Sequence, residues 1–236
     1  MKVARPRKRF GQNFLEDGAT VSRIESAVAP RTRDHVVEIG PGRGALTEAL
    51  VSSGCQLDAI ELDRDLAAGL LAAFSIHPRF KLHSADALAF DYASLLGDGG
   101  NEGTGEKDRR LRIVGNLPYN ISTPLIFKLL ANTAIIEDMH FMLQLEVVKR
   151  LAAQPGGGDW GRLGIMAQYH CFVEHLFDVP PTAFNPPPKV QSAIVRLVPW
   201  RSSPYPPVDE GTLRSTVQAA FAQRRKTLRN NLKGLA

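Results

Sequence analysis

The sequence has only two cysteines, Cys55 and Cys171, among its 236 residues. Two thiols without metal-ligand spacing can form neither a disulfide framework nor a zinc site, so we expect both to be inert in a reducing cytoplasm. No apolar run approaches the roughly 20 residues of a membrane-spanning helix. The basic N-terminus has no apolar stretch behind it, which is not the pattern of a secretory signal. These absences predict a cytoplasmic protein without a membrane anchor.

Positive charge is in excess, with 29 Lys and Arg against 24 Asp and Glu, and it gathers at the two ends of the chain. The start contains RPRKRF (residues 5–10) and the end contains QRRKTLRNNLK (residues 223–233). Clustered basic side chains displace condensed counterions from nucleic acid, which favours a polyphosphate partner. Solvated basic tails are the alternative that charge alone leaves open.

Short apolar runs alternate with amphipathic stretches over the first 150 residues or so of the chain. We expect helices at 44–54, 64–74 and 122–130, two of them bounded by glycine or serine. The strands predicted between them are 35–40, 56–63, 80–86, 111–116 and 139–145. Strands that alternate with helices through short connections predict an α/β fold, a parallel sheet with helices on both faces.

The pattern changes after residue 170, where two strands are expected at 171–179 and 192–200 without a helix between them. Their proline-rich link cannot be helical, so we expect them to pair antiparallel at one edge of the sheet. Residues 97–110 predict a surface loop and 201–211 a linker. A last helix is expected at 212–235 with no partner helix. We therefore divide the chain into a domain of residues 1–200 and a linker with a small helical part, 201–236.

The stretch VEIGPGRGAL places Gly40, Gly42 and Gly44 between a strand and a helix. Glycines at such a position let the backbone turn sharply and let a ligand approach it closely. The loop lacks the Lys-Ser/Thr pair of a phosphate-binding P-loop, so a nucleoside without a polyphosphate fits better. The acidic Glu38 precedes the loop. We expect Gly40 and Gly42 to contact a cofactor.

Polar side chains end the following strands as well. Glu61 can accept hydrogen bonds from ribose hydroxyls, and Asp86 can accept one from an exocyclic amine. Asn116 ends the strand after them. Asp86 or Asp63 could instead simply cap the next helix. The glycine spacing and the strand-end acids together resemble class I S-adenosylmethionine-dependent methyltransferases, which implies adenosine at Glu61 and Asp86 and methionine near Gly40.

The tetrapeptide NLPY, Asn116 to Tyr119, resembles the motif of methyltransferases that act on nucleobase amines. The Asn116 oxygen and a main-chain carbonyl such as that of Leu117 can accept both hydrogens of an adenine amine and aim its lone pair at the methyl group. Pro118 fixes the bend. Tyr119 offers a ring for base stacking, worth roughly 1–3 kcal/mol. A proline turn with an aromatic plug is the alternative.

Phe184 precedes a run of three prolines and is expected to form the opposite wall, so that the base lies between its ring and Tyr119. The alternative is an aromatic residue of the core. A base in paired RNA or DNA would have to be extruded to reach this place, whereas a base in a loop is already available.

The ordered motifs resemble bacterial small-subunit (16S) ribosomal RNA adenine dimethyltransferases of the KsgA type over nearly the whole chain. The matching segments are GQNFLED, VEIGPGRGALT, IELDRD, GNLPYNISTPLIFKLL, MLQLEVVKRL, GRLGIMAQYH, FNPPPKVQSAIVRL and FAQRRKTLRNNLK. The resemblance implies a Rossmann-like methyltransferase domain with a small helical C-terminal domain. It implies dimethylation of two adjacent adenosines in a hairpin loop near the 3′ end of 16S rRNA, during assembly of the small subunit.

The resemblance also implies a set of cofactor contacts, with Asn13 and Leu15 closing over S-adenosyl-L-methionine as an N-terminal flap. The full set is Asn13, Leu15, Gly40, Glu61, Asp86 and Asn116. We expect no metal, because the methyl donor is already activated, and a monomer. Family members carry more helical sequence at the end, so we expect a shortened C-terminal domain here.

Three rival functions share parts of this pattern. The first is a 23S rRNA adenine methyltransferase of the antibiotic-resistance type, although PPPKVQSAIVRL resembles the small-subunit family more. The second is a DNA adenine methyltransferase, for which no target-recognition domain is apparent. The third is a non-catalytic factor in small-subunit assembly, which an intact NLPY and glycine loop argue against.

Overall fold

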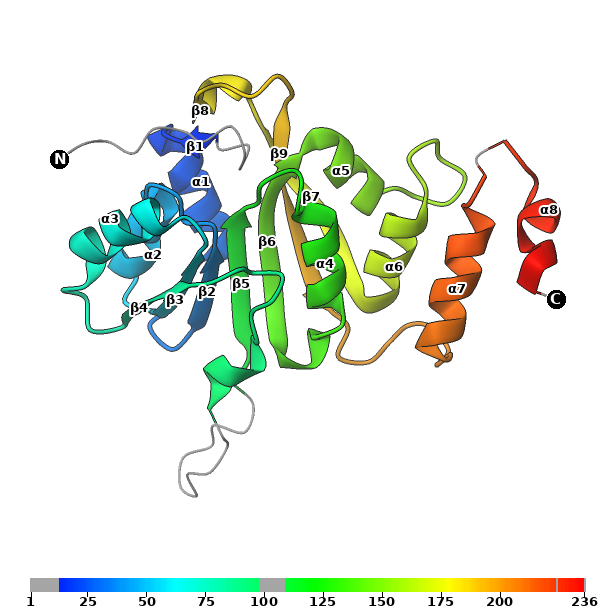
Figure 1. Ribbon diagram of the computed structural model, residues 1–236, viewed down its shortest axis with the longest axis horizontal. Helices are drawn as coiled ribbons and strands as arrows, with labels where there is room; N and C mark the ends of the chain where they lie inside the picture. Colours follow the sequence, from blue (N-terminus) through cyan, green and yellow to red (C-terminus); the bar gives the residue numbers. More distant parts are fainter. Residues whose placement is uncertain (1–12, 98–108, 224, 236) are drawn as a thin grey trace.

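The computed structural model in Figure 1 describes residues 13–97, 109–223 and 225–235, and it is built around a seven-stranded sheet of order β4-β3-β2-β5-β6-β9-β7. Its first five strands in that order run parallel, and β9 pairs antiparallel with both β6 and β7, as predicted. The basic segment 5–10 and most of the predicted 97–110 loop lie outside the described residues. The strands are β2 (His35–Ile39), β3 (Gln56–Glu61), β4 (Phe80–Ser84), β5 (Leu111–Asn116), β6 (Ile136–Gln144), β7 (Cys171–Val179) and β9 (Ser192–Pro199).

Alternation along the strands divides the core between the two faces of the sheet. Val36 packs in one hydrophobic cluster with α1 (Gly18–Val28) and α2 (Ala45–Ser52). Its neighbour Val37 packs in the other, with side chains of α4 (Ser122–Leu130), α5 (Leu145–Leu151) and α6 (Arg162–His170). The predicted α/β class with helices on both faces is thereby confirmed. Within the described ranges, no helix is both long and apolar enough to cross a bilayer.

Helix α1 and strands β1 and β8 were not predicted from the sequence. Helix α1 begins after Asp17, whose carboxylate accepts a hydrogen bond of 2.8 Å from the Thr20 amide and so caps the first turn. A separate two-stranded ribbon pairs β1 (Phe14–Leu15) with β8 (Phe184–Asn185) in antiparallel fashion. It joins residues from opposite ends of the domain, so no local pattern predicts it.

The C-terminal prediction needs two corrections. The single helix expected at 212–235 is two helices, α7 (Glu210–Ala220) and α8 (Leu228–Leu232), with a new N-cap at Thr227. The first of them does have a partner, because α7 packs against α6 (Figure 1). Tyr205, in the stretch before α7, stacks on Tyr169 of α6 with ring centroids 5.9 Å apart. The domain division at residue 200 stays a prediction.

Candidate active site

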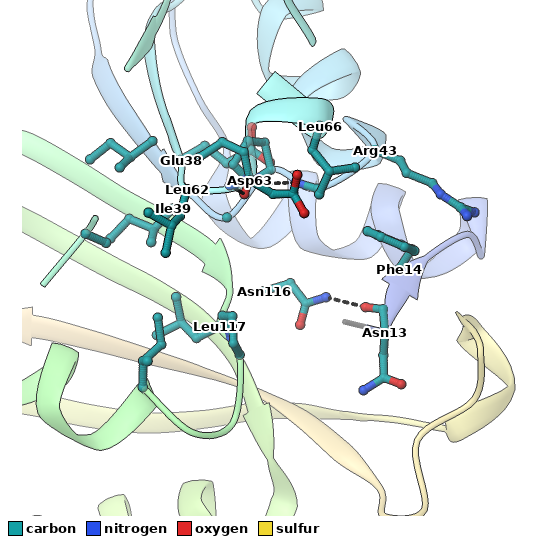
Figure 2. A pocket seen from close by; sticks show the side chains of 18 of the residues that line it. Asn13, Phe14, Glu38, Ile39, Arg43, Leu62, Asp63, Leu66, Asn116 and Leu117 are labelled. Atoms are coloured by element: carbon teal, nitrogen blue, oxygen red, sulfur yellow. Dashed lines mark hydrogen bonds between the residues drawn. The ribbon is translucent and has the colours of Figure 1, made fainter. Parts of the chain in front are cut away.

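A pocket of about 340 Å³ opens at the carboxyl ends of β2, β3 and β5, beside the turn after β4. Open parallel sheets bind their ligands at this edge, and a pocket of this size admits a small molecule. Strand β1 forms part of its wall, and Figure 2 shows Asn13 and Phe14 facing Asn116 and Asp63 from there. Almost all residues predicted from the sequence line it: Asn13, Leu15, Gly40, Gly42, Glu61, Asp86, Asn116, Leu117, Pro118 and Tyr119.

The glycine loop presents bare backbone to this pocket. The backbone φ angles are positive at all three glycines, with 68° at Gly40, 60° at Gly42 and 88° at Gly44. Residues with a side chain rarely adopt this conformation. A β-carbon on Gly42 would lie 3.2 Å from the ring of Phe14, so a side chain there would press on the covering strand. The loop is therefore shaped for close approach between a ligand, the backbone and β1.

Glu61 ends β3 and ties the loop to the next helix. Its Oε2 accepts a hydrogen bond of 3.2 Å from the Gly42 amide, and its Oε1 accepts one of 2.8 Å from the Asp63 amide. Burial raises the pKa of Glu61, and the two amide bonds offset part of that rise. The Leu62 amide also bonds this carboxylate and lowers its pKa, so of about four acceptor positions one remains for a ligand hydroxyl.

Glu38 is a second carboxylate in the pocket, and no role was predicted for it from the sequence. It is buried, and its Oε2 accepts a hydrogen bond of 2.7 Å from the Thr47 hydroxyl of α2. Burial raises the pKa of Glu38 to about 7, against the lowering effect of the Thr47 bond. The signal that could have found it is the acid itself, because a carboxylate inside an apolar strand needs a partner or a function.

The two aspartates of the pocket each hold backbone amides. Asp63 is the N-cap of α3 (Arg64–Phe74) and accepts a hydrogen bond of 3.0 Å from the Asp65 amide. Asp86 accepts one of 2.8 Å from the Leu88 amide in the turn after β4. Both side chains therefore act in part as caps of backbone amides, as the alternative interpretation held. Both also line the pocket.

Asn116 at the end of β5 is oriented by the covering strand. Its Nδ2 donates a hydrogen bond of 3.2 Å to the main-chain oxygen of Asn13, the dashed contact in Figure 2. A carbonyl oxygen can only accept, so the amide must present its NH₂ to Asn13. The Oδ1 atom is then the end of the amide that is free to accept a hydrogen bond from a substrate amine.

Strand β1 is held over the pocket from two sides. The Glu16 and Asp17 amides both donate to the Ala183 carbonyl, next to the β1–β8 pairing. On the glycine-loop side, Arg43 forms a 2.7 Å ion pair with Glu16 and lies 4.3 Å above the Phe14 ring. Strand β1 and the residues next to it, Asn13 to Asp17, form a cover over the pocket. This cover connects the glycine loop, Asn116 and the segment before β9.

The NLPY turn begins at a glycine for a steric reason. A β-carbon on Gly115 would lie 2.5 Å from the Ile39 carbonyl of β2, closer than any real contact, so only glycine lets the two strand ends meet. In the turn itself, the Pro118 carbonyl accepts from the Ile121 amide at 3.1 Å. The Tyr119 carbonyl accepts from the Ser122 hydroxyl, also at 3.1 Å. Leu117 is buried behind Asn116.

Phe184 is the one predicted site residue that the structure does not bring to the pocket. It is 5% exposed and packs in the hydrophobic cluster that also contains Leu15 and Ile24. As part of β8 it pairs side by side with Leu15 of β1. Its burial agrees with the alternative of a core aromatic, while its role opposite Tyr119 stays a prediction.

The parallel sheet and the pocket at its carboxyl edge define a class I S-adenosyl-L-methionine-dependent methyltransferase. The pocket suits that cofactor, because bare glycine backbone meets four carboxylates, which favour a cationic nucleoside: Glu38, Glu61, Asp63 and Asp86. The family model of the ribosomal RNA adenine dimethylases matches residues 3–236, and the chain belongs to that family.

Relatives and solved structures agree with this assignment. The chain is 61% identical to the ribosomal RNA small subunit methyltransferase A of Pseudomonas aeruginosa, over 98% of this chain and 83% of that protein. A dimethyladenosine transferase from Plasmodium falciparum superposes with a TM-score of 0.77 and 27% identity, covering 93% of this chain and 74% of the other. The 23S rRNA methyltransferase ErmE follows with a TM-score of 0.73 and 28% identity, covering 93% and 83%.

Proposed function

We propose that the protein transfers methyl groups from S-adenosyl-L-methionine to the exocyclic amines of two adjacent adenosines in a hairpin loop near the 3′ end of 16S rRNA. Each adenosine receives two methyl groups while the small ribosomal subunit assembles. One observation carries the proposal. The Asn116 amide stands at the cofactor pocket with its NH₂ tied to Asn13, so its oxygen is available for an adenine amine.

The chain acts mainly by alignment. The Asn116 oxygen and the Leu117 carbonyl accept the two hydrogens of the adenine amine, which favours a pyramidal nitrogen with a directed lone pair. Pro118 and Tyr119 hold the turn, whose carbonyls are engaged with Ile121 and Ser122. Bound S-adenosyl-L-methionine supplies a methyl group on a positively charged sulfur, already activated for a nucleophile. Oriented groups of this kind lower the barrier without a strong base.

The cofactor-binding roles follow the lining of the pocket. Gly40 and Gly42 let the backbone approach the methionine part, and Glu61 accepts from the ribose. Asp86 accepts from the adenine amine of the cofactor. Asn13 and Leu15 cover it, since Leu15 belongs to the strand that borders the pocket and Asn13 lies directly before that strand. Tyr119 stacks on the target base.

We also propose how the protein works in the cell. Its partner is 16S rRNA in the assembling small subunit, and it acts as a cytoplasmic monomer that needs no metal, because the donor is already activated. The catalytic domain spans residues 1–200 and the helices of 201–236 contribute to RNA docking. The relatives named small subunit methyltransferase A support this substrate over the 23S rRNA alternative, since they are about twice as similar in sequence as ErmE.

The test is methyl transfer from labelled S-adenosyl-L-methionine to small subunits from a strain that lacks the modification, followed by mapping of the methylated nucleotides. We expect label on two adjacent adenosines near the 3′ end of 16S rRNA and two methyl groups on each. Fully methylated small subunits and large subunits are the controls. Label on 23S rRNA alone would establish the resistance-type alternative, and binding without transfer would establish an assembly factor.

A further inference from the structure

A hydrogen bond joins the NLPY turn to the start of β9. The Tyr119 hydroxyl lies 3.1 Å from the Oγ of Ser192, a residue 73 positions further along the chain. Ser192 opens the last strand of the sheet, directly after the proline-rich segment. The ring assigned to base stacking is therefore attached to a strand outside its own turn.

Ser192 is a fixed point in the molecule. Ser192 is fully buried, with 0% of its surface exposed. Its strand is paired on both sides, because Ser192 is in register with Gln144 of β6 and with Val179 of β7. A side chain on such an interior strand cannot shift without moving the sheet, so the serine hydroxyl is a rigid anchor.

Tyr119 is thus held at both ends. Its carbonyl accepts from the Ser122 hydroxyl at 3.1 Å in the first turn of α4, which fixes the main chain. Its hydroxyl is fixed by Ser192 at the far end of the ring. Two fixed points restrict the position of the ring axis, although the residue itself is only partly buried at the pocket.

We propose that Ser192 is a positioning residue, which holds the Tyr119 ring at the place where the target adenine stacks. The inference rests on the proposed function, because it assigns the occupant of the ring face. A ring ordered before binding loses no rotational freedom when the base arrives, and this strengthens binding. Loss of one hydrogen bond of this kind should weaken it about 3- to 10-fold.

The experiment compares Ser192→Ala, Tyr119→Phe and the double variant in transfer to undermethylated small subunits. Each single variant removes one side of the same bond, so both should raise KM about 3- to 10-fold with kcat within about twofold. The double variant should be no worse than either single one, because the bond is already lost. Ser53→Ala is the matched control: it removes a serine hydroxyl that bonds the Leu50 carbonyl at 2.7 Å, at the end of α2.

A second readout does not depend on transfer. An RNA hairpin with 2-aminopurine in the target position reports stacking by fluorescence quenching, and both single variants should reduce the quenching while Ser53→Ala does not. This readout separates the inference from the proposed function. The proposed function fails if wild-type protein quenches the fluorescence of the hairpin but transfers no methyl group. Cofactor affinity, measured by calorimetry, should stay within twofold in all variants.

Three results would overturn the inference. They are unchanged KM and quenching in Tyr119→Phe, losses that multiply in the double variant, and a cofactor affinity that falls together with RNA affinity. If Ser192→Ala does not fold, Tyr119→Phe decides alone. This substitution removes the same hydrogen bond from the side of Tyr119, which is only partly buried.

Discussion

Replacing Gly115 with alanine should disable transfer while the protein keeps its fold. The new β-carbon would lie 2.5 Å from the Ile39 carbonyl, and relief to a contact of about 3.4 Å requires β5 to retreat from β2 by about 0.9 Å. Asn116 is the next residue and moves with it. A displacement of about 1 Å at a reacting group costs on the order of 100-fold in rate, so kcat should fall by about that factor. The added strain should lower the free energy of unfolding by about 1–3 kcal/mol.

Single-turnover transfer to undermethylated small subunits measures the rate, and urea denaturation measures the stability. Gly69→Ala is the matched control, because a β-carbon there meets no atom within 4 Å in helix α3, and alanine favours a helix over glycine. Gly69→Ala should keep full activity with equal or greater stability. A rate within threefold of wild type for Gly115→Ala would show that the strand-end contact does not set the position of Asn116.

Four further predictions concern the site and the core of the sheet. Asn116→Ala should abolish transfer and leave RNA binding largely intact in a filter-binding assay; undiminished transfer would refute the amine-acceptor role. Glu38 should lose its stabilising proton as the pH rises, because burial raises its pKa from 4.5 to about 7. The free energy of unfolding of cofactor-free protein should therefore fall by roughly 3 kcal/mol between those pH values, with the loss complete above pH 7, and Glu38→Gln should remove this slope in urea titrations. Arg43→Ala should weaken cofactor binding by up to about fivefold in calorimetry, because it frees the covering strand from a partly exposed ion pair and a ring contact; unchanged affinity would show that the cover holds without it. Cys171 should resist thiol reagents in the native state at pH 8, because burial raises its pKa to about 12; rapid labelling without denaturant would contradict this.

The seven strands of the main sheet could be predicted because each one contains a short stretch rich in apolar residues, and in β3 and β5 a polar residue ends it. The predicted stretch from Leu111 to Asn116 coincides with β5. Helix α1 was not predicted, although Val21, Ile24 and Val28 follow a helical spacing after the Asp17 cap. The C-terminal helix was predicted as one piece, since its break lies between residues with good helix propensity. Tertiary contacts with α6 decide its arrangement.

The site residues that could be predicted are those at the ends of individual strands. Glu61, Asp86 and Asn116 each follow an apolar run, and parallel strands bring such ends together. Contacts between distant segments could not be predicted, and the bond from Asn116 to Asn13 spans 103 positions. The burial of Phe184 could not be predicted for the same reason, because it depends on pairing with Leu15. The hydrogen-bond partner of Glu38 could not be predicted either, because Thr47 lies on the neighbouring helix.

The cover of the pocket is a ribbon of two residues on each side, separate from the main sheet. Because it shares no ladder with the seven strands, it can part without breaking any of their hydrogen bonds. Spent donor must leave and fresh donor must enter between successive methylations of one nucleotide. The small ribbon can therefore move for that exchange while the seven strands keep their pairing.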